Sequence, residues 1–129
     1  MSRQFRIRDF VQNILGCTCP DKVFKQIEDM RVASSFSPHT RSITIGGRLL
    51  VYIWNVKRAE KLRENLFAML EAGRKERDER GLKRFRAVLA VDGIPQYVER
   101  EATAYLSEYT GKDDRIHVHV ISSADIKDV

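Results

Sequence analysis

The spacing of apolar residues predicts a helix near the start of the chain. Over roughly residues 6–15, apolar side chains recur at the i, i+3, i+4, i+7 and i+8 positions of a helix with one buried stripe. The residues of this stripe are Ile7, Phe10, Val11, Ile14 and Leu15. Gly16 follows them, and glycine is common just beyond a helix end, so we expect the helix to stop there.

A second helix is predicted to begin at Pro20. Proline suits the first helical position, which makes Cys19 the expected N-cap and places Asp21 where its charge complements the helix dipole. The inner face of this helix would consist of Val23, Phe24, Ile27 and Met30. Residues 31–40 fit either a short strand or a loop, because apolar residues are interspersed there with serines and a proline.

The next segment has the pattern of a β-hairpin. Ile43 and Ile45 alternate with polar residues, and Gly46-Gly47 suits a two-residue turn. The run from Leu49 to Val56 is rich in residues that favour a buried strand. We therefore expect two antiparallel strands here.

Helices and strands alternate after the hairpin. A long helix with its inward side at Ala59, Leu62, Leu66, Met69, Leu70 and Gly73 is predicted to stop at Gly81. Its charged end, residues 74–80, is expected to extend into solvent or to meet a partner. A continuous apolar run over 85–91 predicts a strand covered on both faces. Apolar residues with helical spacing over 98–109 predict another helix. Alternating apolar and polar residues over 116–121 predict a final strand.

These elements predict a single α/β domain over residues 1–129. Helical crossovers between strands are right-handed, so the last three strands should be parallel, with the first hairpin strand antiparallel to them. The expected architecture is one mixed sheet of about four to five strands, built from N-terminal helices, the hairpin and a βαβαβ unit, with helices on its faces.

Composition narrows the classes of function. The chain is 43% hydrophobic and 32% charged, and no segment approaches the roughly 18 apolar residues of a membrane span. We therefore expect a cytoplasmic protein without a membrane partner. The net charge of +5 favours acidic proteins or nucleic acid as partners, although 18 acidic residues are mixed among the 23 basic ones.

The two cysteines of the chain are Cys17 and Cys19, which lie beside the predicted start of the second helix. A helix N-terminus favours thiolate over thiol, and thiolate binds metals and attacks disulfides. Three interpretations stay open, namely buried structural residues in a tight turn, a metal site, and a redox pair whose strained disulfide would be easily reduced.

A metal at these thiols would need further ligands. Two cysteines supply half of the four ligands that Zn²⁺ or an iron–sulfur cluster normally takes. A homodimer would bring four cysteines together. Within one chain, His117 and His119 are the alternative, because positions i and i+2 of a strand share one face.

Two other places have the residue types of a ligand site. Lys57, Arg58 and Lys61 are predicted in the first turns of the long helix, where an anion such as phosphate would offset their repulsion by the dipole. Asp92 follows a buried parallel strand, at the sheet edge where α/β proteins place ligands. Solvated cations and an ordinary Asp-Gly turn are the alternative explanations.

Two resemblances add to this picture. The order of helix, small antiparallel unit, helix and strand over about residues 20–92 resembles the core of PD-(D/E)xK nucleases, with Asn55-Val56-Lys57 at the carboxylate-x-Lys motif. Asn55 replaces the metal-binding acid, and residues 42–46 contain no aspartate, so the resemblance implies a nuclease-derived domain without the usual catalysis.

The second resemblance concerns the cysteine turn. The segment from Leu15 to Phe24, which contains Cys17-Thr18-Cys19-Pro20, is similar to the N-terminal motif of small uncharacterised bacterial and archaeal proteins. This similarity implies no particular activity. The leading hypothesis from sequence is therefore a thiol site for metal binding or redox chemistry. The alternatives are a non-catalytic homo-oligomeric interaction module and an anion- or nucleic-acid-binding nuclease-derived domain.

Overall fold

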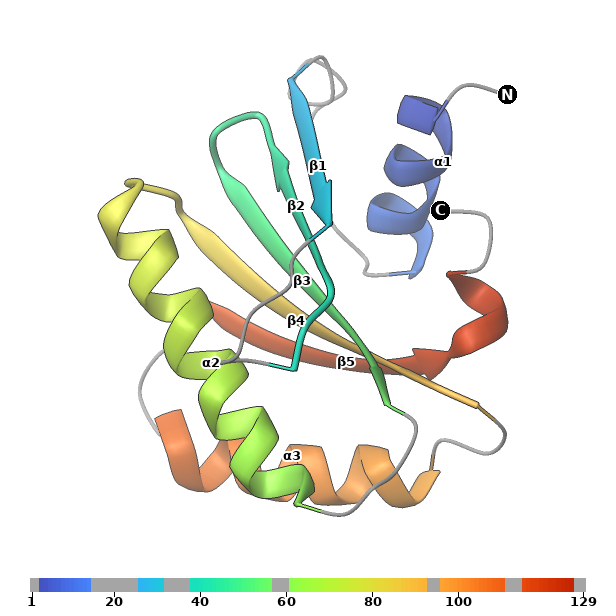
Figure 1. The fold of residues 1–129 in the computed structure, drawn as a ribbon, viewed down its shortest axis with the longest axis vertical. Coiled ribbons are helices and arrows are strands. Elements are labelled where there is room, and N and C mark those ends of the chain that lie inside the picture. The colour runs from blue at the N-terminus through green and yellow to red at the C-terminus, as the bar shows by residue number, and fades with distance from the viewer. Residues whose placement is uncertain are drawn as a thin grey trace.

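The computed structural model describes residues 3–14, 26–31, 38–56, 61–92, 96–110 and 115–126. Within them, five strands form one mixed sheet in the order β1-β2-β3-β4-β5 (Figure 1). The strands are β1 (Ile27–Arg31), β2 (Arg41–Ile45), β3 (Leu49–Val56), β4 (Arg84–Val91) and β5 (Ile116–Ser122). The first three are antiparallel neighbours, whereas β3, β4 and β5 run parallel. The predicted α/β fold with a single mixed sheet is confirmed.

Helices cover both faces of the sheet (Figure 1). One face carries α2 (Leu62–Glu79) and α3 (Gln96–Thr110). The other carries α1 (Arg3–Asp9), which continues as the π-helical turn η1 (Phe10–Ile14). A short 3-10 helix, η3 (Ser123–Asp125), follows β5 directly. No helix in these ranges is both long and apolar enough to cross a membrane.

The sheet separates two apolar cores. On the α1 face, Ile7, Phe10 and Val11 from the predicted stripe are buried against the hairpin and against β4. On the other face, α2 and α3 bury their stripes against β3 and β4. Gly73 of α2 lies so close to this sheet face that an added Cβ would be 2.1 Å from the ring of Phe85. Here glycine is required because helix and strand approach closely.

The hairpin and the later elements are present where the sequence predicts them, but the turn differs in length. Gly46 and Gly47 both adopt positive φ, and because Ile45 pairs with Leu49, the turn has three residues, Gly46 to Arg48, instead of the predicted two. The long helix ends at Glu79 with Arg80 as its C-cap, and Gly81 follows with φ of +67°. The strand over 85–91, the helix over 98–109 and the strand over 116–121 are each present within one to two residues of their predicted bounds.

The prediction for Ile27 and Met30 was wrong. Both residues lie in strand β1 instead of a helix, where they pair with Ile45 and Ser42 of β2. Three-residue spacing places them on opposite faces of a strand. Ile27 therefore packs against the α1-side core, whereas Met30 is 61% exposed. Sheet pairing overrides the helical spacing of these two residues. The other residues of that predicted helix lie outside the described part of the chain.

The charged end of α2 also differs in part from its prediction. Most of its side chains are exposed, as expected for an end that extends into solvent, but Arg77 is 1% exposed. Arg80 reaches across to β2 and β1, with its Nη1 3.0 Å from Oγ1 of Thr44 and its Nη2 3.2 Å from a carboxylate oxygen of Glu28. The aliphatic stems of such arginines can be buried while their guanidinium groups keep polar partners.

Candidate functional site

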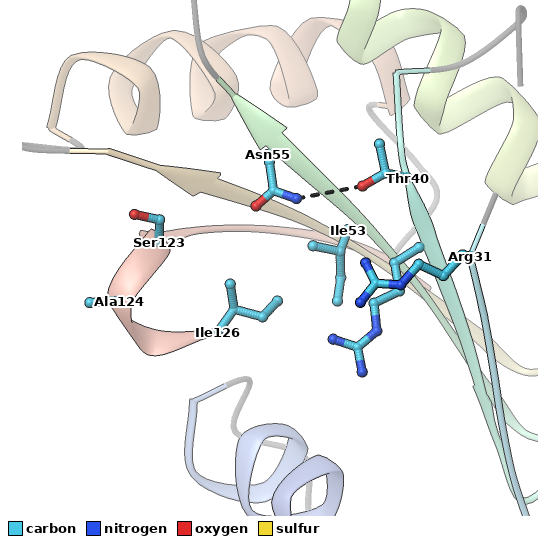
Figure 2. A pocket seen from close by; sticks show the side chains of 8 residues that line it. Arg31, Thr40, Ile53, Asn55, Ser123, Ala124 and Ile126 are labelled. Carbon is cyan, nitrogen blue, oxygen red and sulfur yellow. Dashed lines mark hydrogen bonds between the residues drawn. The ribbon is translucent and has the colours of Figure 1, made fainter. Parts of the chain in front are cut away.

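A pocket of about 500 Å³ lies at the edge where the parallel strands have their carboxyl ends. Open α/β sheets place their ligands at this edge, because loops and unpaired backbone groups gather there. Figure 2 shows Arg31 and Thr40 on one side of the pocket, with Ser123, Ala124 and Ile126 on the other. The lining residues are Arg31, Thr40, Arg41, Ile53, Asn55, Ser123, Ala124 and Ile126. These described lining residues include two arginines and no Asp or Glu.

Two arginines meet at the rim because of strand register. Arg31, the last residue of β1, pairs directly with Arg41, the first residue of β2. Like charges directly opposite each other in an antiparallel pair are unfavourable. Arg41 is largely buried, and it is held by two hydrogen bonds of 2.8 and 2.7 Å to the two carboxylate oxygens of Asp29. Asp29 thereby orients Arg41 and neutralises one of the two cations.

Arg31 is the second cation at this rim, and its charge is not neutralised by the contact between Asp29 and Arg41. Its side chain is exposed, and in the described part of the chain no ion pair of Arg31 is present. Asp29 already uses both oxygens on Arg41. The β1–β2 side of the pocket, with two arginines and Asp29, therefore has a surplus of positive charge, which favours an anionic ligand there.

Neutral polar groups lie next to these cations. Asn55, on β3, donates a long hydrogen bond of 3.5 Å from its amide nitrogen to the hydroxyl oxygen of Thr40 (Figure 2). The backbone N–H of Thr40 donates to the carbonyl of Ile53 at 2.9 Å, which ties this residue to β3. A hydroxyl and an amide can both donate to phosphate or to a sugar or base.

Asp92 reaches the same edge from β4. The hydroxyl of Ser123 donates a hydrogen bond to its carboxylate. Ser122 caps η3 by accepting from the backbone N–H of Ala124 at 3.3 Å. The sequence analysis placed Asp92 at the correct edge, and its contact in the structure is with Ser123, which lines the pocket.

A larger groove of about 950 Å³ lies on the opposite face, between α2 and the hairpin. There His39 stacks on Tyr52 with ring centroids 3.7 Å apart, and the Tyr52 hydroxyl donates to Glu76. Burial and the Glu76 carboxylate raise the pKa of Tyr52. Glu76 also forms an ion pair of 2.7 Å with Arg80. Charges in this groove are thus largely neutralised by one another, unlike those at the Arg31 rim.

The predicted anion site at the start of the long helix is described only in part. Lys57 and Arg58 lie outside the described residues. Lys61 is exposed and forms the N-cap of α2 with φ of 56°, and its side chain makes no capping hydrogen bond. Because the helix begins at Leu62, Lys61 precedes the first turn in which the prediction placed it.

His117 and His119 share one face of β5, as expected from their spacing. Val118 and Val120 point the other way, against the core beneath α2 and α3. Nε2 of His119 is 2.9 Å from Nη1 of Arg86, and arginine can only donate, so this imidazole nitrogen accepts the hydrogen bond. Burial and the nearby Arg86 charge lower the pKa of His119 to about 4. Metal binding through this nitrogen would require Arg86 to move.

Cys17 and Cys19 lie outside the described residues, so the thiol hypothesis stays a prediction from sequence. Among the residues that the structure describes, no group of three or more His, Cys, Asp or Glu side chains could hold a metal ion. In the same ranges, His119 has a cation as its neighbour instead of further ligands.

The sequence analysis named Asp92 as a candidate at the sheet edge and Asn55 only as a departure from the nuclease motif, and it named none of Arg31, Thr40 and Arg41 as a site residue. Arg31 and Thr40 bound the segment whose sequence fits either a short strand or a loop, and Arg41 follows it. Their meeting depends on the β1–β2 register, which no local pattern indicates. No protein-family model matches this chain, and no curated protein or solved structure matches it either.

Proposed function

We propose that the protein binds nucleic acid through backbone phosphate at the pocket beside Arg31 and Arg41, and that it does not cleave it. The observation that carries this proposal is that Arg31 and Arg41 are cross-strand partners at the rim, where Asp29 is bonded to Arg41. Arginine is well suited to phosphate because its planar fork offers several donors. The net charge of +5 would add attraction at longer range.

The arrangement of the sheet supports a nuclease-derived origin. Strands β2 and β3 are followed by a helix and a parallel strand, which agrees with the last part of the order in the PD-(D/E)xK resemblance, whereas β1 lies where that resemblance has a helix. Asn55 lies on β3 at the pocket, where that family's motif has a metal-binding carboxylate. A neutral amide is a weaker ligand for a hard divalent cation than a carboxylate. For this reason we propose binding instead of hydrolysis.

The test is a binding measurement by fluorescence anisotropy with labelled DNA. Wild-type protein is compared with Arg31→Ala and with Arg48→Ala, whose exposed side chain lies at the hairpin turn, the other end of the strands. We expect Arg31→Ala to weaken binding severalfold and Arg48→Ala to change it little. Equal effects of the two substitutions would contradict the pocket as the phosphate site.

A nuclease assay tests the second half of the proposal. The same DNA is incubated with protein and Mg²⁺ or Mn²⁺, and product is compared between wild type and Asn55→Ala. We expect no cleavage that depends on Asn55. Cleavage that disappears in Asn55→Ala would mean that the pocket is a nuclease site.

The thiol site is a second proposal, supported by the Cys17-Thr18-Cys19-Pro20 motif alone. Metal analysis of protein purified without oxygen, combined with a count of free thiols, tests it. Stoichiometric Zn²⁺ or iron that is lost in the Cys17→Ser, Cys19→Ser double variant would support a metal site. Two inert thiols with no metal would favour a structural turn or a module that acts through other surfaces.

A further inference from the structure

We infer that the pocket accommodates one unstacked nucleotide, so that the protein prefers single-stranded nucleic acid to duplex. This inference rests on the proposed function and concerns the ligand class of the same site. It is carried by the chemical difference between the two sides of the pocket. The β1–β2 side presents Arg31 and Arg41, whereas Ala124 and Ile126 lie on the opposite side, and Ile53, the cross-strand partner of Arg41, lines the pocket between them (Figure 2).

The apolar part of the lining borders the protein core. Ile53 is 1% exposed, and Ile126 packs against the same α1-side cluster. A phosphate alone has no favourable interaction with such a wall, because it would lose hydration there. A nucleotide has a phosphate at one end and the apolar face of a base at the other. Its two ends match the two sides of the pocket.

The size of the pocket agrees with this ligand. A cavity of about 500 Å³ lies in the range of small-molecule sites and exceeds what one phosphate requires. In a duplex, bases are stacked and paired, so their faces cannot enter a recess of the protein. In a single strand, bases can turn outward, pack on side chains and use their edges for hydrogen bonds. Asn55 and Ser123 are placed to contact such an edge.

The experiment compares a labelled single strand of about 12 nucleotides with a blunt duplex of the same sequence. We expect the single strand to bind about tenfold more tightly. A pocket-filling variant, Ala124→Leu, adds bulk at an exposed position and should reduce single-strand binding to the level of the duplex. Thr103→Leu, at an exposed position of α3, is the matched control and should leave the preference intact.

The outcomes separate this inference from the proposed function. If both ligands bind equally and Arg31→Ala weakens both, phosphate binding at the pocket stands and the unstacked nucleotide is contradicted. If single-strand preference survives Ala124→Leu unchanged, the pocket is not the source of the preference, which also contradicts the inference. If neither ligand binds at low salt, both proposals fail.

Discussion

Arg31 and Arg41 lie directly opposite each other across the β1–β2 pair, and Asp29 holds Arg41 through both carboxylate oxygens. Opposed like charges are unfavourable in a strand pair and are usually avoided by sequence or by register. Here the arrangement borders a pocket without acidic lining residues among those described. An anionic ligand between the two guanidinium groups would be attracted to both of them and would offset their mutual repulsion.

Replacing Arg31 with Ala should separate stability from binding. Removing one of two opposed cations should leave the free energy of unfolding unchanged or raise it by up to about 1 kcal/mol. The same change should also make the affinity for DNA less sensitive to salt. The slope of the logarithm of the binding constant against the logarithm of the salt concentration should fall by about 1, the amount expected for one lost phosphate contact. Urea unfolding and anisotropy over a salt series measure the two effects. A variant that loses stability and binding together would indicate a structural role for Arg31.

Replacing Asp29 with Asn should destabilise the fold because Arg41 would keep its charge in a largely buried position. The side chains of Asp29 and Arg41 are 5% and 10% exposed, and removing one partner of such a pair costs about 3 kcal/mol. The matched control is Glu28→Gln on the same strand, where the ion pair to Arg80 is exposed and contributes under about 1 kcal/mol. Similar unfolding midpoints for the two variants would contradict a supporting role of Asp29.

Replacing Asn55 with Asp should weaken nucleic-acid binding. A carboxylate at the pocket would repel phosphate and would attract Arg31 toward itself. Asn65→Asp makes the same chemical change on α2, away from the pocket, and controls for the loss of net positive charge. Isothermal titration with the same oligonucleotide should give a weaker affinity for Asn55→Asp than for Asn65→Asp. Equal affinities would mean that net charge alone governs binding.

Replacing Gly73 with Ala should destabilise the packing of α2 on the sheet. The new methyl group would overlap the Phe85 ring, and overpacking of this kind costs about 1–3 kcal/mol. Lys75→Ala, on the exposed face of the same helix, should change the free energy of unfolding by less than about 0.5 kcal/mol. Thermal unfolding of both variants measures the difference. A stabilised Gly73→Ala variant would show that α2 and β4 can separate at no cost.

His119 should make the fold less stable in acid. Its pKa is about 4 when folded and 6.5 ordinarily, so the unfolded chain binds more protons between these values. The stability from neutral His119 is therefore complete above about pH 6.5 and is lost as pH falls toward 4. His119→Gln, which does not titrate, should flatten this part of the stability curve relative to wild type. An NMR titration giving an ordinary pKa for His119 would contradict the buried contact with Arg86.

Elements that depend on residues close together in the sequence were predicted correctly, whereas contacts between residues far apart in the sequence were not. Local patterns identified the hairpin, whose turn needs the positive φ of Gly46 and Gly47, and the helices whose stripes run for several turns. They failed for Ile27 and Met30, since three-residue spacing fits a helix and the competing β1–β2 pairing is a tertiary contact. The rim of the pocket was missed for the same reason. Arg31 and Arg41 are brought together by strand register, which no local spacing reports.

The most direct test of phosphate binding at this pocket is an NMR titration of wild-type protein with a short single-stranded oligonucleotide, in which backbone amide shifts are followed residue by residue. We predict the largest changes at Arg31, Thr40, Arg41, Asn55 and Ser123, and smaller changes at Lys61. Changes confined to Lys61 and its neighbours, or to the groove around Tyr52, would contradict the account even if the oligonucleotide binds tightly.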